Sequence, residues 1–331
     1  MRLRLTNDGW SSGPEEIIDC IVVGGGPAGL TAAIYLSRFL RSCAVFDAGS
    51  GRAASIPRSH NLPGFPEGIP GVELLARMQT QLREFGGTIQ SGEVHSIAPS
   101  DEGFLVSCDL EVLRARTVIL ATGVVNHRPE MPAMMHDIGV ASGLIRYCPV
   151  CDGYEARGMN IAVIGSSEHG AAEAQFLMSY GSRVTLLAQN SLDLSRSDIA
   201  ELAHRGIEVA RSPIQQLNVA SDQVEVSLED GQQLRFDTLY PALGSSPRTR
   251  LATAIGARLS SSGCLLTDLH QQTSVPGLFA AGDVVEGLDQ ISVAIGQAAK
   301  AATAIHNLLR DRDDEVALAK ETSGISHPRS I

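Results

Sequence analysis

Two cysteines separated by two residues, with an acid directly after them, are the part of this sequence best suited to chemistry. They are Cys148 and Cys151, followed by Asp152. A Cys-x-x-Cys pair can close to a disulfide and reopen, and it can thereby store and release two electrons. The neighbouring carboxyl group can carry protons to and from a thiolate. We therefore predict a redox-active dithiol with catalytic roles for both cysteines and for Asp152.

A zinc site is the main alternative for this pair, and it needs two further soft ligands nearby. Cys108 and Cys264 are remote in the sequence, and His127 and His136 lack the spacing of paired ligands. The sequence therefore predicts no metal site. Two chemically inert cysteines are a further alternative, and Asp152 is then an ordinary turn residue.

The composition limits the classes of protein to consider. The chain has 331 residues, 44% of them hydrophobic, with 33 glycines and a net charge of -11. These values are typical of an α/β protein with glycine-rich turns, and the negative charge argues against nucleic-acid binding. No apolar run approaches the roughly 20 residues that a membrane-spanning helix needs. Residues 1–16 lack the apolar core of a signal peptide, so we expect a cytoplasmic protein that binds neither nucleic acid nor a membrane.

A glycine fingerprint near the start of the chain predicts a dinucleotide site. Gly24, Gly26 and Gly29 form the pattern G-x-G-x-x-G between an apolar run and a helical run. The first glycine permits the turn, the second lets the backbone approach a pyrophosphate, and the third lets the helix pack closely on the strand. Asp47, about 20 residues further on, can accept a hydrogen bond from a ribose hydroxyl. The alternative is a glycine-rich turn beside a surface aspartate.

A second fingerprint follows the cysteines, but it departs from the pattern. Ser167 stands where the second glycine belongs, and its hydroxymethyl group would crowd a pyrophosphate. The next predicted strand ends in Ala188-Gln189-Asn190, with no acid for a ribose and no arginine for a 2′-phosphate. Arg196 and Arg205 lie further on and leave a displaced contact open. We predict that this unit binds a nicotinamide nucleotide poorly or not at all.

Periodicity and turn residues predict the other elements. Expected strands are residues 17–23, 42–46, 93–97, 104–108, 117–120, 160–164, 183–188, 224–228, 233–236, 238–243 and 278–281. Expected helices are residues 30–40, 71–85, 171–179 and 291–309. The polar tail at 311–331 is expected to lose its helical periodicity after about residue 320, and His327-Pro328-Arg329 is either a disordered end or a flap.

These motifs resemble those of the low-molecular-weight thioredoxin reductases, which are FAD-dependent pyridine nucleotide-disulfide oxidoreductases. The resemblance covers about residues 16–309 and depends on five motifs in the family's order. The motifs are residues 24–29, 61–66, 121–123, 148–153 and 277–283.

The resemblance implies an α/β fold of two Rossmann-like, three-layer ββα nucleotide-binding domains, with the second inserted in the first. Residues 1–125 and 248–331 are expected to form the FAD-binding domain, with a C-terminal tail at 311–331. Residues 126–247 are expected to form the inserted NAD(P)-binding-like domain, which carries the two cysteines. A homodimer is also implied.

The resemblance further implies an FAD site. The residues expected to bind the cofactor are Gly24, Gly26, Pro27, Ala28, Gly29, Asp47, Asn61, Ala121, Thr122, Gly123, Gly282, Asp283, Gln290, Ile291 and Ser292. The fingerprint glycines and Asp47 are expected to hold the ADP half. Asp283 is expected to bind the ribityl chain, and residues 290–292 are expected near the flavin ring.

The function implied is a thiol-disulfide oxidoreductase in which two electrons pass between FAD and the disulfide. Cys151 is expected to face the flavin, and Cys148 to attack the disulfide of a thioredoxin-like protein or a small dithiol compound. Because Ser167 and residues 188–190 replace the family's fingerprint glycine and His-Arg-Arg stretch, we do not expect NADPH or NADH as the donor. The alternatives are an oxygen-using dithiol oxidase, a ferredoxin-dependent reductase, an NADPH thioredoxin reductase with a displaced site, and a flavin-bearing redox sensor.

Overall fold

The computed structural model describes residues 17–109 and 111–323. It divides into two compact units. The first is made of the chain up to Gly51, Leu75–Val124 and the chain from Pro247 onward. The second is made of Arg52–Leu74 and Val125–Ser246. Within the described part of the chain, no helix is long and apolar enough to cross a membrane.

The first unit is built on a seven-stranded sheet. Its order is β3 (Ile89–Ser91), β2 (Cys43–Asp47), β1 (Ile17–Val23), β6 (Glu111–Leu120), β5 (Gly103–Cys108) and β4 (Val94–Ser100), and β16 (Leu278–Ala280) also pairs with β6. The strands β1, β2, β3, β6 and β16 run parallel to one another, whereas β5 is antiparallel to both of its neighbours, β4 and β6. β6 begins earlier than expected because its first half pairs with β5.

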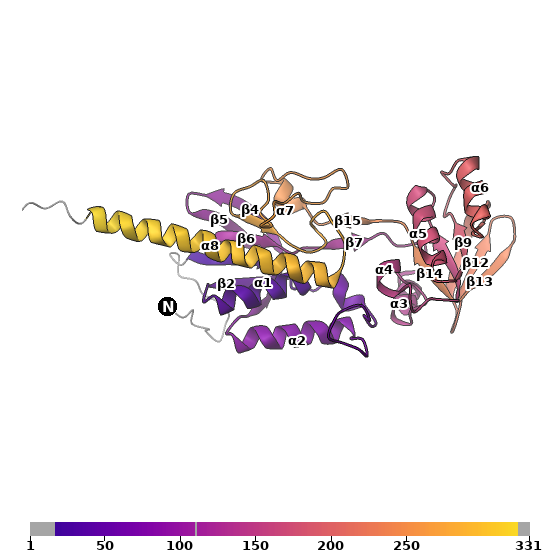
Figure 1. Ribbon diagram of the computed structural model, residues 1–331, viewed down its shortest axis with the longest axis horizontal. Helices are drawn as coiled ribbons and strands as arrows, with labels where there is room; N and C mark the ends of the chain where they lie inside the picture. The colour runs from indigo at the N-terminus through magenta and orange to yellow at the C-terminus, as the bar shows by residue number, and fades with distance from the viewer. Residues whose placement is uncertain (1–16, 110, 324–331) are drawn as a thin grey trace, which may run out of the picture. The chain divides into compact units, whose positions relative to one another are not determined.

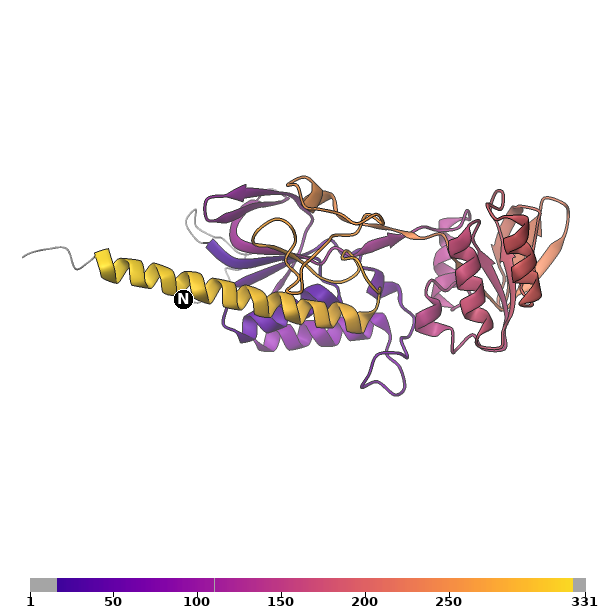
Figure 2. The same ribbon diagram turned by 45° about the horizontal axis from the view of Figure 1, so that its top comes forward.

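Two helices of this unit pack against each other. They are α1 (Pro27–Arg38) and the C-terminal α8 (Ile291–Ser323), which lie side by side in Figure 1 and Figure 2. The inner face of α1 is apolar, with Leu30, Ile34 and Leu36 buried. Apolar side chains of α8, among them Ile305 and Leu309, are also buried, so burial of apolar surface holds the two helices together.

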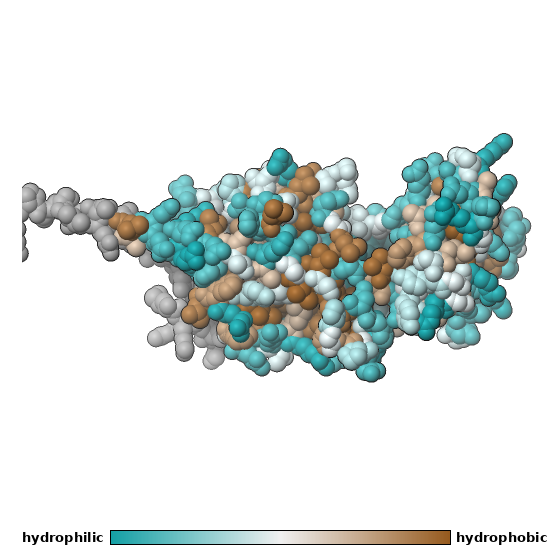
Figure 3. All heavy atoms as spheres, viewed as in Figure 1, coloured by the Kyte–Doolittle hydropathy of each residue, from teal (hydrophilic) through white to brown (hydrophobic). Residues whose placement is uncertain are grey.

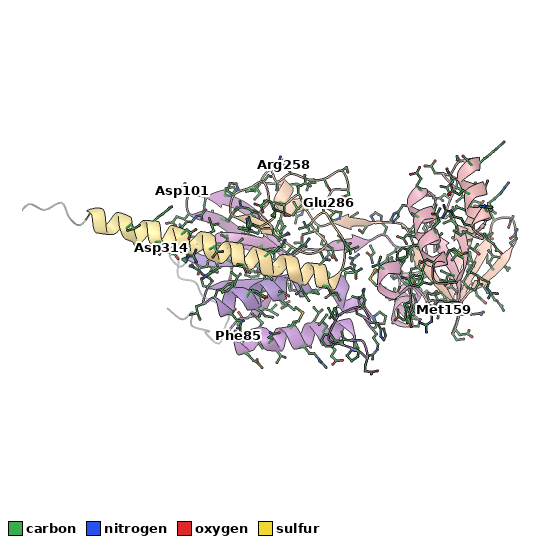
Figure 4. All side chains as sticks on the ribbon, in the orientation of Figure 1. Phe85, Asp101, Met159, Arg258, Glu286 and Asp314 are labelled. Carbon is green, nitrogen blue, oxygen red and sulfur yellow. A yellow bond between two sulfur atoms is a disulfide. The ribbon has the colours of Figure 1, made fainter. Side chains whose placement is uncertain are left out.

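α8 is longer than the helix expected at residues 291–309. It continues to Ser323, close to residue 320, where the helical periodicity of the tail was expected to be lost. Residues 310–320 contain neither glycine nor proline, and most of them are good helix formers. Asp313 also fastens the extension, because its carboxylate pairs with Arg41 at 2.8 Å and with Arg116 at 2.7 Å. Figure 4 labels the neighbouring Asp314 on this extension. The expected tail features at 324–331 lie outside the described residues.

The second unit contains a parallel sheet with a small antiparallel sheet beside it. The parallel order is β10 (Glu208–Val209), β9 (Arg183–Leu187), β8 (Asn160–Ile164) and β14 (Thr238–Pro241). The antiparallel order is β11 (Ile214–Val219), β12 (Val224–Leu228) and β13 (Gln233–Phe236). The helices α5 (Glu168–Met178) and α6 (Arg196–His204) complete the unit, and Figure 3 shows polar residues over much of the visible face of its α6 region.

The remaining elements lie between these along the chain. They are η1 (Arg52–Ser55), α2 (Gly71–Glu84), β7 (Val124–Asn126), α3 (Ala133–Ala141), α4 (Pro149–Asp152), β15 (Ser245–Pro247) and α7 (Arg250–Thr253). α2 crosses the division between the units, and β7 and β15 form a two-stranded sheet of their own.

The predicted α/β fold class, with two Rossmann-like units, is confirmed. The strands at 160–164, 224–228 and 233–236 lie where the sequence predicts them. α1 and α5 each begin earlier than expected, at Pro27 and Glu168. The reason is shared by both fingerprints. The third glycine of the pattern, Gly29 or Gly170, lies inside the first turn of the helix and not before it.

Candidate functional site

The two cysteines form a disulfide at the start of a single helical turn. Cys148 is the residue before α4, and Pro149 occupies its first position, where a proline fits because no hydrogen-bond donor is needed. The backbone N–H of Cys151 donates to the carbonyl oxygen of Cys148, and the nitrogen atom lies 3.1 Å from Cys148 Sγ. Both cysteines are partly exposed. The turn therefore brings the two sulfur atoms together and keeps them accessible for exchange.

Asp152 is held by two side chains of the same unit. The Tyr240 hydroxyl donates to Asp152 Oδ1 at 2.8 Å, and Arg146 Nη1 lies 3.2 Å from Oδ2. Burial raises the pKa of Asp152, while the charge of Arg146 and the hydrogen bond from Tyr240 oppose that rise. Sequence reasoning missed both partners. A tyrosine inside an otherwise apolar strand was a signal for Tyr240, since a buried hydroxyl needs a hydrogen-bond partner.

The four other cysteines have different surroundings. Cys20, Cys43 and Cys108 are buried, and Cys264 is partly exposed. Burial raises the pKa of each thiol, to about 11 for Cys108. A thiol with a raised pKa is a poor nucleophile at neutral pH, so the chemistry of thiol exchange falls to Cys148 and Cys151. Among the described residues, no group of three or more His, Cys, Asp or Glu side chains is placed to hold a metal ion.

The first fingerprint forms a tight glycine loop between β1 and α1. A Cβ on Gly29 would collide with the backbone oxygen of Gly24, and one on Gly24 would collide with that of Ala121. Gly24 also has φ +110°, in the region that favours glycine. At Gly26 the situation is the opposite, because an added Cβ would meet no atom within 4 Å. The loop is therefore closed on its inner side and open at the position where a pyrophosphate would approach.

Other predicted cofactor residues lie around this loop. Asp47 ends β2, and its carboxylate is 2.7 Å from the position of a Cβ on Gly25. Gly282 packs against Ala28 of α1, since its Cβ would lie 3.1 Å from that of Ala28. The Gly282 N–H donates to Gln297 Oε1 of α8 at 2.8 Å. The structure thus gathers a carboxylate, the N-terminus of α1 and two glycine turns in one place.

The remaining predicted residues are distributed as follows. Thr122 and Gly123 continue the turn after β6, where the Thr122 hydroxyl donates to the Arg248 carbonyl at 2.8 Å. Asp283 follows Gly282 in the turn after β16. Pro27 is the first residue of α1, Gln290 precedes α8, and Ile291 and Ser292 begin it. Asn61 belongs to the other unit, where the Ser59 hydroxyl donates to its Oδ1 at 3.0 Å.

The first loop fits the ADP half of FAD on the observations above. Backbone N–H groups at the start of α1 offer a positive dipole end to a diphosphate. The space at Gly26 admits its approach, and the Asp47 carboxylate is an acceptor for ribose hydroxyls.

In the second fingerprint the glycines also let the strand and the helix pack closely. The position that would face a pyrophosphate is different. A Cβ on Gly165 would lie 2.6 Å from the Cα of Gly170, so strand and helix are as close as in the first loop. Ser167 precedes α5 in extended conformation. The N–H of Asp193 donates to the Ser166 carbonyl at 2.6 Å, so the chain after β9 folds back onto the turn.

The position of the ribose acceptor holds no acid, because Ala188 stands there. The Gly165 N–H donates to the carbonyl of Leu187, directly before Ala188, just as the Gly24 N–H donates to that of Phe46, directly before Asp47. The next residue, Gln189, is held within the unit, since its Oε1 accepts a hydrogen bond from the Glu130 N–H at 2.9 Å. Acidic side chains lie close by in the sequence, with Glu168 in the first turn of α5 and Asp193 in the chain after β9. Negative charge next to the turn disfavours a phosphate. The residues present therefore fit a nicotinamide dinucleotide poorly.

Comparison with known proteins places the chain in a family. The family described as pyridine nucleotide-disulphide oxidoreductase matches residues 18–298. Thioredoxin reductase of Bacillus subtilis (strain 168) is 28% identical over 318 residues, which are 92% of this chain and 99% of that protein.

Solved structures agree. The crystal structure of HlmI superimposes with a TM-score of 0.86 at 28% identity, over 94% of this chain and 98% of that one. Thioredoxin reductase from Streptococcus pyogenes MGAS5005 gives a TM-score of 0.81 at 27% identity, over 89% of this chain and 99% of that one. The predicted resemblance is confirmed, and so is FAD as the family's cofactor. The chain belongs to the pyridine nucleotide-disulphide oxidoreductase family and is a flavin-dependent disulfide oxidoreductase of the thioredoxin reductase type.

Proposed function

We propose that two electrons pass between FAD and the Cys148–Cys151 disulfide, and that a thioredoxin-like protein or a small dithiol compound exchanges with this pair. The observation that carries the proposal is the disulfide itself, formed in a helical turn, with the carboxyl group of the next residue, Asp152, held by the Tyr240 hydroxyl. The relatives named thioredoxin reductase support a thioredoxin-like partner.

We infer that residues 1–125 and 248–331 form the FAD-binding domain, of which the first unit is the larger part, and that residues 126–247 form the inserted domain that carries the dithiol. When bound, FAD supplies a two-electron carrier that can reduce a disulfide. Gly24, Gly26 and the start of α1 would bind its diphosphate, and Asp47 its ribose. Asp283 and residues 290–292 would lie at the ribityl chain and the ring. The contacts of the Gly282 turn with Ala28 of α1 and with Gln297 of α8 support this set of FAD-binding residues.

The exchange with a partner disulfide is proposed to take two steps. The Cys148 thiolate attacks the partner disulfide, a mixed disulfide forms, and the released partner thiolate takes the proton of Asp152. The Asp152 carboxylate then accepts the proton of Cys151, whose sulfur attacks Cys148. The Cys148–Cys151 bond forms, and the second partner thiolate leaves. Two electrons have moved from the dithiol to the partner, and Asp152 has regained its proton.

The electron donor is proposed not to be NADPH or NADH. The support is the contact of Asp193 with Ser166, the contact of Gln189 with Glu130, and the hydroxymethyl group of Ser167. The same observations favour a second candidate function, which is an oxygen-using dithiol oxidase. In that direction a substrate dithiol becomes a disulfide, and molecular oxygen takes the two electrons and two protons as hydrogen peroxide.

The flavin absorbance of the purified protein tests these proposals. The oxidised protein is mixed without oxygen with NADPH, NADH, dithiothreitol or reduced ferredoxin. We expect dithiothreitol to bleach the flavin and the nicotinamide nucleotides to leave it oxidised. Bleaching by micromolar NADPH would contradict the proposed exclusion of that donor. Rapid reoxidation by air with repeated turnover would favour the oxidase, and bleaching by ferredoxin alone would make the donor a protein.

One variant completes the test. Cys148→Ser is expected to abolish partner turnover and to retain the flavin, because Cys148 is the proposed attacking sulfur. A biological effect that survives Cys148→Ser would indicate a redox sensor. Size-exclusion chromatography and cell fractionation test the homodimer and the cytoplasmic location, which stay predictions.

A further inference from the structure

The carboxyl group of Asp152 has a separate partner for each oxygen. Tyr240 OH donates to Oδ1 at 2.8 Å and lies 3.3 Å from the Asp152 carbonyl oxygen. Arg146 Nη1 pairs with Oδ2 at 3.2 Å. Arg146 precedes the dithiol in the sequence, whereas Tyr240 comes 88 residues after Asp152 on β14. The two partners therefore fix the carboxyl group from different parts of the second unit.

We propose that Arg146 and Tyr240 are positioning residues that hold the Asp152 carboxyl group beside the dithiol and set the pH range in which it exchanges protons with the thiols. This inference rests on the proposed role of Asp152 in thiol-disulfide exchange. It adds two residues that act through Asp152 and do not themselves contact the sulfur atoms in the proposed steps.

Both partners are themselves fixed. Tyr240 is fully buried and pairs with Val163 in the parallel sheet, so its ring has no freedom to turn away. Arg146 Nε donates to the Gly143 carbonyl at 2.9 Å, and Gly143 has φ +73°. A guanidinium group with this second contact presents its other nitrogen atoms in one direction. Rigid support of this kind is what precise proton transfer needs.

The electrostatic effects of the two partners have the same sign. Burial raises the pKa of Asp152, the positive charge of Arg146 and the hydroxyl of Tyr240 lower it, and the negative charge of Glu155 raises it. On the side of α5, the ring of Tyr180 lies against Gly153. Removing Arg146 or the Tyr240 hydroxyl must therefore raise the pKa of Asp152, because burial and Glu155 remain.

The test measures how the reduced dithiol reacts with a chromogenic aromatic disulfide from about pH 4 to 9. One limb of the plot of reaction rate against pH reports the titration of Asp152. It is identified by the Asp152→Asn variant, in which that limb is absent. In Arg146→Gln we expect this limb to move up by about one pH unit, and in Tyr240→Phe to move up by less. Arg146→Lys retains the charge and is expected to keep the limb close to that of the unmodified protein.

Matched controls come from the same turn. Arg157 lies over the ring of the exposed Tyr154, with its guanidinium carbon 3.9 Å from the ring centroid. Arg157→Gln and Tyr154→Phe remove the same chemical groups near the dithiol without touching Asp152, and they are expected to leave the limb in place. Circular dichroism establishes that each variant is folded.

Two results would overturn the inference. One is an unchanged limb in folded Arg146→Gln and Tyr240→Phe. The other is an equal shift in the controls, which would indicate a general charge effect. The assay uses chemically reduced protein and needs neither FAD nor a partner protein. A failure of flavin reduction in the earlier experiment therefore leaves this assay interpretable, and a failure here leaves the flavin result intact.

Discussion

The glycine loops of the two units pack their strand and helix together in the same way. They differ at the position that would face a bound pyrophosphate. In both, the first and third glycine positions let a strand and a helix approach closely. In the first, Gly26 leaves open space. In the second, Ser167 carries a side chain, the Asp193 N–H donates to the Ser166 carbonyl, and Gln189 accepts a hydrogen bond from the Glu130 N–H. The comparison teaches that the glycines needed for folding and the glycine needed for binding are separable.

The largest effect is expected from Gly29→Ala, which adds a side chain where the strand and the helix of the first loop pack closely. Its Cβ would collide with the Gly24 backbone oxygen, and backbone cannot move aside cheaply. Overpacking of this kind costs about 1–3 kcal/mol or more. We expect loss of bound flavin and a lower Tm, measured by absorbance and thermal unfolding. Gly170→Ala is the matched change in the second loop and is expected to lower stability while the flavin content is retained. Equal flavin loss in both variants would contradict the assignment of FAD to the first loop.

A smaller effect is expected from Gly26→Ser, which gives the first loop the same residue type that the second loop has at Ser167. No atom lies within 4 Å of the new Cβ, so we expect the fold and Tm to persist. The hydroxymethyl group would occupy the space needed by the diphosphate, and FAD affinity is expected to fall by about 10- to 100-fold. Titration of the FAD-free protein with FAD measures this.

The reciprocal variant, Ser167→Gly, is expected not to restore reduction by NADPH. The contacts Asp193–Ser166 and Gln189–Glu130 remain in that variant. Flavin bleaching by NADPH in Ser167→Gly would mean that the serine alone excludes the nucleotide.

The smallest effect concerns the extension of α8 in the first unit. Burial alone would raise the pKa of Asp313, but hydrogen bonds from Arg41 and Arg116 outweigh it and lower the pKa. A lowered folded-state pKa gives stability that is present above the unfolded value of about 4 and is lost as the pH falls through the folded value. Asp313 is partly exposed, so solvent screening limits the contribution to about 1 kcal/mol or less.

Asp313→Asn is therefore expected to lower Tm slightly at neutral pH and to match the unmodified protein in strong acid. Thermal unfolding at several pH values measures the difference. Asp314→Asn is the neighbouring control on the same helix and is expected to show a smaller loss at neutral pH. A loss from Asp313→Asn that is independent of pH would indicate that the ion pairs do not stabilise the helix.

Features that depend on residues close together in the chain could be predicted from the residue types and their spacing. The Cys148-x-x-Cys151 pair lies in one helical turn, and the first fingerprint is a strand, a turn and a helix in succession. Such features follow from backbone geometry within a few residues, so their residue types and spacing reveal them. The same holds for the strands of the second unit and for Ser167, which replaces the second glycine of its fingerprint.

Contacts between residues far apart in the chain could not be predicted, because they depend on how the elements pack. Tyr240 reaches Asp152 across 88 residues, Gln189 meets Glu130 across 59, and Asp313 meets Arg41 across 272. None of these pairs has a local signature, because each depends on how sheets and helices pack and not on the spacing of the residues. The fold thus supplied the surroundings of the Asp152 carboxyl group, the contacts of Gln189 and Asp193 in the second unit, and the ion pairs of Asp313 on α8. The physical reason is that packing brings remote side chains into contact, and single-sequence patterns record only near neighbours.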